Sequence, residues 1–178
     1  MIRAGHRKAA ALIILAAASA THAQAVAPPP APMVKNWTAP SYKIKAQALI
    51  DAFMARHPEV QNTTFHGIPP GKSEYTMFAG TFPDRIGKAS APHDIVVLTD
   101  RLISLETRFA PTDSPRKAVA MIPLRDNSGK DIATVVFAFS DVRNDEKASA
   151  YYVSAAIELR DELMKDISSY QDLFAPAK

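Results

Sequence analysis

Two apolar runs joined by a short polar turn constrain the fold of this chain more than any other feature. The runs cover residues 118–125 and 130–140, and Asp126–Gly129 connects them. Asn and Asp side chains cap backbone groups in such turns, and glycine tolerates positive φ. The pattern predicts two neighbouring antiparallel strands and therefore a β-sheet. Because Pro123 has no backbone N–H, its part of the strand is expected at a sheet edge or a bulge.

Three further stretches of the sequence predict strands. Val60–Ile68 and Ser73–Gly80 are β-leaning and are separated by Pro69–Lys72, which indicates a hairpin. Asp94–Asp100 contains consecutive β-branched and leucine side chains, which favours a middle strand covered on both faces. Residues 101–109 are expected to extend or follow that strand.

Helical periodicity flanks this strand-forming part of the chain. One amphipathic stretch starts at Ser41 and ends before Pro58, and a longer one covers residues 146–168. The residues around Leu173 are expected to fold back onto the domain. The resulting prediction is an α+β fold, in which an antiparallel sheet of about five strands carries an N-terminal helix and a long C-terminal helix on one face.

The first 25 residues have the order of a secretory signal peptide. Positive charges precede an apolar run at 9–18, and small residues lead to Ala25. A bilayer span needs about 20 apolar residues, so we expect cleavage and no membrane span afterwards. The proline-rich stretch 26–40 is expected to be a linker, and 41–178 a single domain. Export of a chain without cysteine fits the bacterial periplasm.

Charge and cysteine content exclude several classes of function. The chain has 178 residues, no cysteine, and 21 basic against 18 acidic side chains. Three basic residues and no acidic ones precede residue 26, so cleavage leaves 18 of each sign and no electrostatic basis for binding nucleic acid. The lack of cysteine excludes a disulfide scaffold, covalently attached haem and thiolate chemistry.

The order of elements, and especially residues 119–139, resembles the last strand pair of an extracytoplasmic PAS-like sensor domain of the single-Cache type. Asp84–Ser90, followed by Asp94, is similar to the loop that enters the middle strand of such domains. The resemblance covers residues 42–168. It implies a curved five-stranded sheet that cups a small ligand, often a carboxylate or an amine. Because no second membrane segment or output domain is evident, it also implies a free-standing module.

No motif in the sequence predicts catalysis, a metal site or a cofactor. A Gly-x-Ser-x-Gly elbow is absent, and His57, His66 and His93 lack the spacing that places two ligands on one helical face. We therefore expect a protein that is not an enzyme. A small cofactor-free hydrolase that uses His66 or His93 as its base stays open as an alternative.

Five residues are candidates for ligand binding. His66 could point into the cup and donate to an anion, Tyr75 offers an aromatic wall, and Arg85 could bind a carboxylate with two hydrogen bonds. Asp94 and Asp100 bracket the expected middle strand and would favour a cationic ligand. Each also has an ordinary structural role as its alternative: a capping histidine, a packed tyrosine, a solvated arginine or a turn aspartate.

The preferred function is a periplasmic, non-catalytic module that binds a small molecule or a partner protein, in envelope sensing. The alternative is an envelope scaffold without a pocket, in which the linker and a helix stripe recruit a partner. A homodimer through the terminal helices is also possible if Ile44, Leu49 and Phe53 face outward.

Overall fold

The computed structural model describes residues 33–108 and 116–178, so the expected signal peptide and residues 26–32 of the expected linker lie outside it. The main elements follow in the order α1 (Lys45–Arg56), β1 (Val60–Gly67), β2 (Thr76–Gly80), the 3₁₀ helix η1 (Pro83–Arg85), α2 (Pro92–Thr99), β3 (Ser104–Arg108), β4 (Lys117–Arg125), β5 (Asp131–Phe139) and α3 (Ala148–Leu163). Two 3₁₀ turns, η2 (Met164–Asp166) and η3 (Gln171–Phe174), complete the chain.

The five strands form one antiparallel sheet in the order β2-β1-β5-β4-β3, which confirms the predicted fold class. In the turn between β4 and β5, Gly129 has a φ of 84°. There Oδ1 of Asp126 accepts hydrogen bonds from the backbone of Ser128 and Lys130. Strand β3 pairs only with residues 117–121 of β4, so Pro123 lies where β4 has a strand on one side, as its missing N–H predicts.

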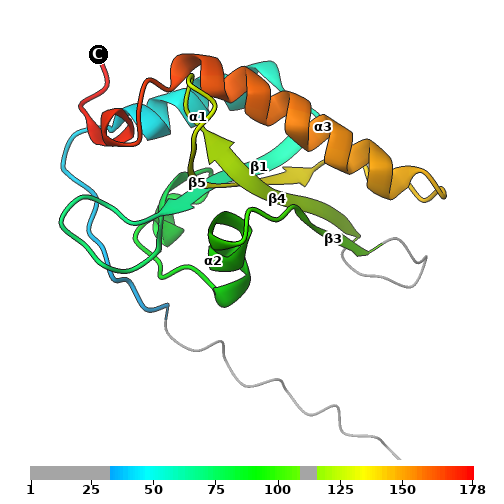
Figure 1. Ribbon diagram of the computed structural model, residues 1–178, viewed down its shortest axis with the longest axis horizontal. Coiled ribbons are helices and arrows are strands. Elements are labelled where there is room, and N and C mark those ends of the chain that lie inside the picture. Colours follow the sequence, from blue (N-terminus) through cyan, green and yellow to red (C-terminus); the bar gives the residue numbers. More distant parts are fainter. Residues whose placement is uncertain (1–32, 109–115) are drawn as a thin grey trace, which may run out of the picture. The chain divides into compact units, whose positions relative to one another are not determined.

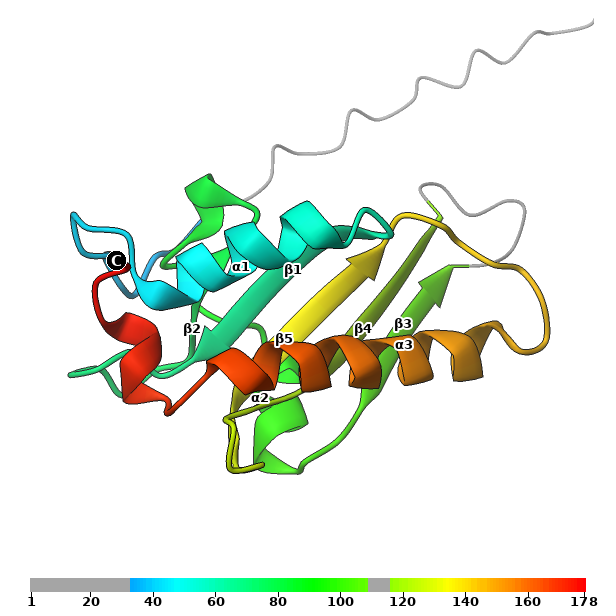
Figure 2. The ribbon, with the colours of Figure 1, turned by 90° about the horizontal axis from the view of Figure 1, so that it is seen from above.

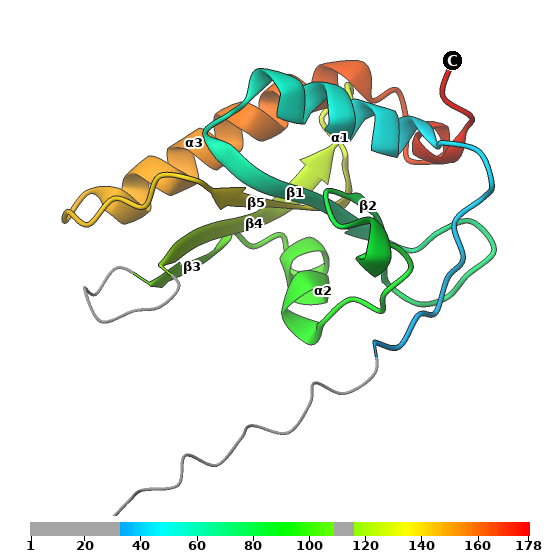
Figure 3. The same ribbon diagram turned by 180° about the vertical axis from the view of Figure 1, so that it is seen from behind.

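Helices cover both faces of the sheet. Figures 1 and 3 show α1 and α3 on one face and α2 on the other. Seen from above, α1 lies along β1, and α3 crosses β5, β4 and β3 (Figure 2). The two predicted helices therefore share one face as expected, whereas α2 is an additional helix, not predicted from the sequence, on the opposite face.

The stretch Asp94–Asp100, expected as a middle strand, is instead most of helix α2. Pro92 fits the first helical turn, and the Asp94 carboxylate accepts a hydrogen bond of 2.9 Å from the Ala91 N–H, which caps the helix start. Val97 is buried while neighbouring Val96 is 40% exposed, so the helix has one apolar face. The run of β-branched residues favoured a strand covered on both faces, so the sequence pattern did not indicate that only one side is buried.

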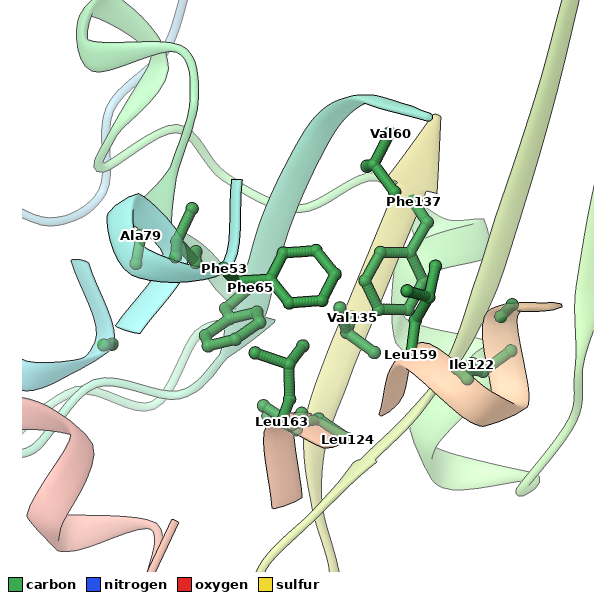
Figure 4. Packing of buried hydrophobic residues seen from close by; sticks show 14 of the residues in the cluster. Phe53, Val60, Phe65, Ala79, Ile122, Leu124, Val135, Phe137, Leu159 and Leu163 are labelled. Carbon is green, nitrogen blue, oxygen red and sulfur yellow. The ribbon is translucent and has the colours of Figure 1, made fainter. Parts of the chain in front are cut away.

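The main core lies between the sheet and the pair α1 and α3. Phe53 of α1, Phe65 of β1, Phe137 of β5 and Leu163 of α3 meet there (Figure 4). Burial of each such side chain stabilises the fold by about 1.5–3 kcal/mol. Because Ile44 and Phe53 are buried in this core, they do not face outward to form the dimer seam considered above.

Both ends of the described chain pack on this core. Trp37, within the stretch expected as a linker, is only 9% exposed, and its ring meets that of Phe174 edge-on at 6.1 Å. Leu173 and Phe174 are buried, which confirms that the C-terminal tail folds back. The folded body therefore includes residues that precede Ser41.

Candidate functional site

A cavity of about 320 Å³ lies on the face of the sheet that carries α2. Side chains from β1, β2, β5 and β4 line the cavity on the sheet side, and its other walls come from the segment 82–94 and from Glu106 of β3. The sheet thus forms a hollow covered by its own connecting segments, in the place where the sequence suggested a ligand cup.

The period of two along each strand selects which residues reach the cavity. On β1, Asn62, Thr64 and His66 line it, whereas Phe65 points into the core. Strands β4 and β5 alternate in the same way and supply the apolar centre of the floor: Val119, Met121, Val136 and Ala138.

His66 is the most constrained polar side chain in the cavity wall. It is 8% exposed; its Nε2 lies 2.9 Å from Oγ1 of Thr64, and its Nδ1 lies 3.0 Å from Oγ of Ser90. Burial lowers the pKa of His66, the carboxylate of Asp94 opposes this effect, and the charges of His93 and Lys88 add to it. The ring is therefore neutral at pH 7 and can donate one hydrogen bond.

Arg85 and Lys88 bring positive charge to the wall of the cavity. The guanidinium of Arg85, at the end of η1, lies 4.5 Å from the centre of the Phe82 ring. Among the described residues, neither Arg85 nor Lys88 belongs to an ion pair, so both charges are available to a ligand.

Asp94 is the acidic group at the same end of the cavity. Its Oδ2 accepts the Ala91 N–H and lies 3.5 Å from Nδ1 of His66, while Oδ1 lies 3.4 Å from Nε2 of His93. The backbone oxygen of Asp94 also accepts a hydrogen bond from Thr134, which ties α2 to β5. Asp94 therefore organises this end of the cavity through contacts within the protein.

Glu106 and Lys117 form the opposite end of the cavity. Their side chains make an ion pair of 2.8 Å between β3 and β4, and each is more than a third exposed. Exposed pairs of this kind contribute only about 0.2–1 kcal/mol to stability, so either partner can be diverted to a polar group of a ligand.

Of the five residues predicted from the sequence, His66, Arg85 and Asp94 line the cavity. Tyr75 precedes β2 and is half-buried; its backbone oxygen accepts hydrogen bonds from Asn36 and Ser90, and its side chain does not line the cavity. Asp100 is exposed at the far end of α2, away from the cavity, because that segment is a helix. Whether the three lining residues bind a ligand stays a prediction.

Sequence reasoning missed Thr64, Lys88, Ser90, and the pair of Glu106 with Lys117. One signal was available for the first of these, because polar residues at alternate positions 62, 64 and 66 indicate one polar strand face. No comparable signal exists for Lys88 or Ser90, whose positions depend on how the loop after β2 folds over the sheet.

A second cavity, of about 350 Å³, lies beside α3, on the face of the sheet opposite α2. Its acidic groups are already engaged: Glu59 and Glu162 both contact the ring of His57, and Glu162 also pairs with Arg56. The cavity at His66 is lined by two cations that belong to no ion pair within residues 33–108 and 116–178, and it is the better candidate for a ligand site.

Two further observations concern metal binding and membrane spanning by the described residues. Across residues 33–108 and 116–178, no cluster of three or more histidine, aspartate or glutamate side chains could hold a metal ion. In the same part of the chain, each helix is too short or too polar to span a bilayer.

No protein-family model and no curated protein matches the sequence, but solved structures do. The GAF domain of a two-component sensor histidine kinase from Bacillus halodurans has a TM-score of 0.44 and 10% identity, over 70% of this chain and 95% of that one. A type II free methionine-R-sulfoxide reductase from Thermoplasma acidophilum has a TM-score of 0.41 and 13% identity, over 69% and 92%. The E. coli DcuS sensor domain has a TM-score of 0.36 and 14% identity, over 63% and 71%.

Two of these three neighbours are named as sensor proteins and one as an enzyme. At such identities and TM-scores, the likeness carries no argument about the ligand or the chemistry of this chain. Placement among extracytoplasmic Cache domains stays a prediction from the sequence.

Proposed function

We propose that this domain is a non-catalytic binding module for a small organic anion with an apolar body. The observation that carries the proposal is that Arg85 and Lys88, which have no ion-pair partner among the described residues, line a cavity with a polar wall and an apolar floor. The predicted export of the chain supports a role in sensing within the bacterial periplasm.

The charges that face the cavity favour an anion. Arg85 and Lys88 lack acidic partners within the described chain, whereas Glu106 is paired with Lys117 and Asp94 accepts the Ala91 N–H. A carboxylate that contacts Arg85 would gain charge-assisted hydrogen bonds, which are about twice as strong as those between neutral groups. A cation at the same place would meet two like charges.

The floor of the cavity favours an apolar body behind the charged group. Val119, Met121, Val136 and Ala138 offer no hydrogen bonds from their side chains, and each buried CH₂ group of a ligand contributes about 0.8 kcal/mol. The volume of about 320 Å³ lies at the lower end of the range for small-molecule sites.

A thermal-shift comparison of hexanoate, hexan-1-ol and hexylamine at constant ionic strength tests the proposal. The three probes share an apolar chain and differ in charge. We expect only hexanoate to stabilise the protein, by about 1.4 kcal/mol at ten times its dissociation constant, or roughly 3–6 °C for a domain of this size. Selective stabilisation by hexylamine would instead favour a cationic ligand, and a flat response to all three would favour the pocket-free scaffold.

Substitutions assign the binding to the cavity. Arg85→Ala and Lys88→Ala should each weaken hexanoate binding about five- to tenfold, because each removes a cation that lines the cavity. Lys165→Ala is the matched control, since Lys165 is exposed in η2 and does not line the cavity. Equal loss of binding in all three variants would indicate a nonspecific charge effect.

The alternative function, a hydrolase, can be tested because the contact between Thr64 and His66 identifies its nucleophile and its base. A histidine within 2.9 Å of a hydroxyl is the first requirement of a base-activated nucleophile. Both side chains are buried in a strand, and burial lowers the pKa of His66, which makes the ring a weaker base than an exposed histidine. We expect wild type and His66→Gln to hydrolyse 4-nitrophenyl acetate at the same background rate; a rate that depends on His66 would support catalysis.

A further inference from the structure

The residues that bring positive charge to the cavity lie on a short segment held from both sides. We call residues 85–89 the roof segment and residues 34–37 the N-terminal strap. The roof segment bonds to β2, because Gly87 N–H donates to the Met77 oxygen at 2.8 Å and Met77 N–H donates to the Lys88 oxygen at 2.9 Å. The roof segment therefore extends the sheet beyond the edge of β2.

The N-terminal strap pairs with the outer side of the roof segment. The N–H groups of Asn36 and Trp37 donate to the Gly87 oxygen at 2.9 and 3.3 Å, and Ala89 N–H donates to the Val34 oxygen at 3.3 Å. Lys35 and Lys88 form an antiparallel bridge. The roof segment is thus the middle of three adjacent backbone segments, and its two neighbours fix it.

Gly87 allows this close pairing. Its φ is +89°, and a Cβ atom there would lie only 2.0 Å from the backbone oxygen of Trp37. A side chain at residue 87 is therefore incompatible with the docked strap on two independent grounds, backbone conformation and contact.

The strap has its own anchors, so it holds the roof segment firmly. The side chain of Asn36 accepts a hydrogen bond from Thr76 and donates to the Tyr75 oxygen at 3.2 Å and to Glu74 at 3.0 Å. The ring of Trp37 is buried beside Phe174. These contacts join the strap to β2 and to the C-terminal tail, while Arg85, Lys88 and Ala89 line the cavity.

We infer that docking of the N-terminal strap and binding of an anion in the cavity are coupled through the roof segment. An undocked strap leaves the roof segment paired on one side only, so the cations of Arg85 and Lys88 lose their fixed position. By linkage, a ligand held by these cations must stabilise the docked strap by the same factor. The ligand half of this inference rests on the proposed anion site.

Hydrogen exchange without ligand tests the first part of the inference, that the docked strap fixes the roof segment. Asn36→Ala removes the side-chain anchors of the strap and leaves the core side chain Trp37 in place. We expect the amides of Gly87 and Met77, which bond between the roof segment and β2, to exchange at least about fivefold faster, together with the Trp37 amide. Asn144→Ala, at an exposed loop position, is the matched control and should exchange as wild type does. Faster exchange at residues 36–37 with unchanged Gly87 and Met77 amides would overturn the inference.

Hexanoate tests the ligand half. Saturating hexanoate should slow exchange of the Trp37 amide about fivefold. Asn36→Ala should weaken hexanoate binding in proportion to the fraction of molecules in which it undocks the strap. Trp37 is the single tryptophan of the chain, so its fluorescence reports docking independently. Equal affinity in wild type and Asn36→Ala, with unchanged exchange at Trp37, would contradict the coupling. If hexanoate binds neither protein, the proposed anion site fails, and the exchange result without ligand still decides whether the strap holds the roof segment.

Discussion

Asp94 is the residue whose charge opposes the others at the cationic end of the cavity. Replacing it with asparagine removes one negative charge, and the amide oxygen can still accept the Ala91 N–H that the carboxylate now binds at 2.9 Å. We expect Asp94→Asn to bind hexanoate about three- to tenfold more tightly by titration calorimetry, because an unfavourable charge is gone. Weaker binding of hexanoate would mean that the contacts of the Asp94 carboxylate with Ala91, His66 and His93 are needed to build the site.

His57 gives the fold a dependence on pH that is independent of the cavity. Its Nδ1 lies 2.8 Å from Glu59, and its Nε2 lies 3.0 Å from Glu162. Partial burial disfavours the charged ring, but the two carboxylates outweigh this effect and raise the pKa of His57 above 6.5. The stability from these contacts is therefore complete below pH 6.5 and is lost as pH rises through the raised pKa of the folded state.

We expect the free energy of unfolding, measured with urea, to fall as the pH rises above 6.5 in wild type and to fall less in His57→Gln. Glu59→Gln removes one of the two carboxylates and should reduce the slope in part. A slope that is unchanged in both variants would show that His57 does not cause it.

Sequence reasoning at the scale of single residues reached three of the cavity residues for physical reasons. His66 follows from its place in a strand, and Arg85 follows from a loop expected to cover the pocket. Asp94 was chosen as the end of an expected strand, and that segment is helix α2. The side chains of Tyr75 and Asp100, which were also predicted, do not line the cavity. The position of Tyr75 depends on where β2 begins, and that of Asp100 depends on the conformation of residues 92–99. Ion pairs between strands, such as Glu106 with Lys117, depend on a register that local patterns do not fix.

Among the elements, α2 is the one whose local sequence favours a strand although the segment is a helix in the folded protein. A strand covered on both faces would bury Val96 and Val97 alike, but the helix buries Val97 to 1% exposure and leaves Val96 at 40%. We expect Val97→Ala to cost about 1–2.5 kcal/mol in urea unfolding, whereas Val96→Ala should be neutral or slightly stabilising because alanine favours helix. Equal costs at the two positions would support the strand.

The elements with a strong internal pattern were predictable, and α2 was not. The hairpin of β4 and β5 has a turn with Asp126 and Gly129, and α1 and α3 repeat their apolar residues at helical spacing. Helix α2 has only eight residues, and its start depends on the contact between Asp94 and Ala91. Eight residues give too little periodicity to distinguish a one-sided helix from a buried strand.

At the scale of the whole molecule, the predicted signal peptide leads to a testable expectation about where the domain works. We expect a chain expressed in a bacterium to be recovered from the periplasm without residues 1–25, as intact mass would show. Leu15→Lys places a charge in the apolar run and should leave the full-length chain in the cytoplasm. Recovery of an uncleaved wild-type chain from the cytoplasm would contradict the predicted export.

Along the central strands, residues that face the core alternate with residues that face the cavity. Selection for stability and selection for ligand binding therefore act on alternate positions. On β4, Ala118, Ala120 and Ile122 belong to the core, while Val119 and Met121 face the cavity. A saturation scan that scores abundance and ligand affinity separately should show two profiles that are out of phase by one residue. Ligand preference could then diverge between descendants of this chain while the opposite side of the same strands stays under purifying constraint.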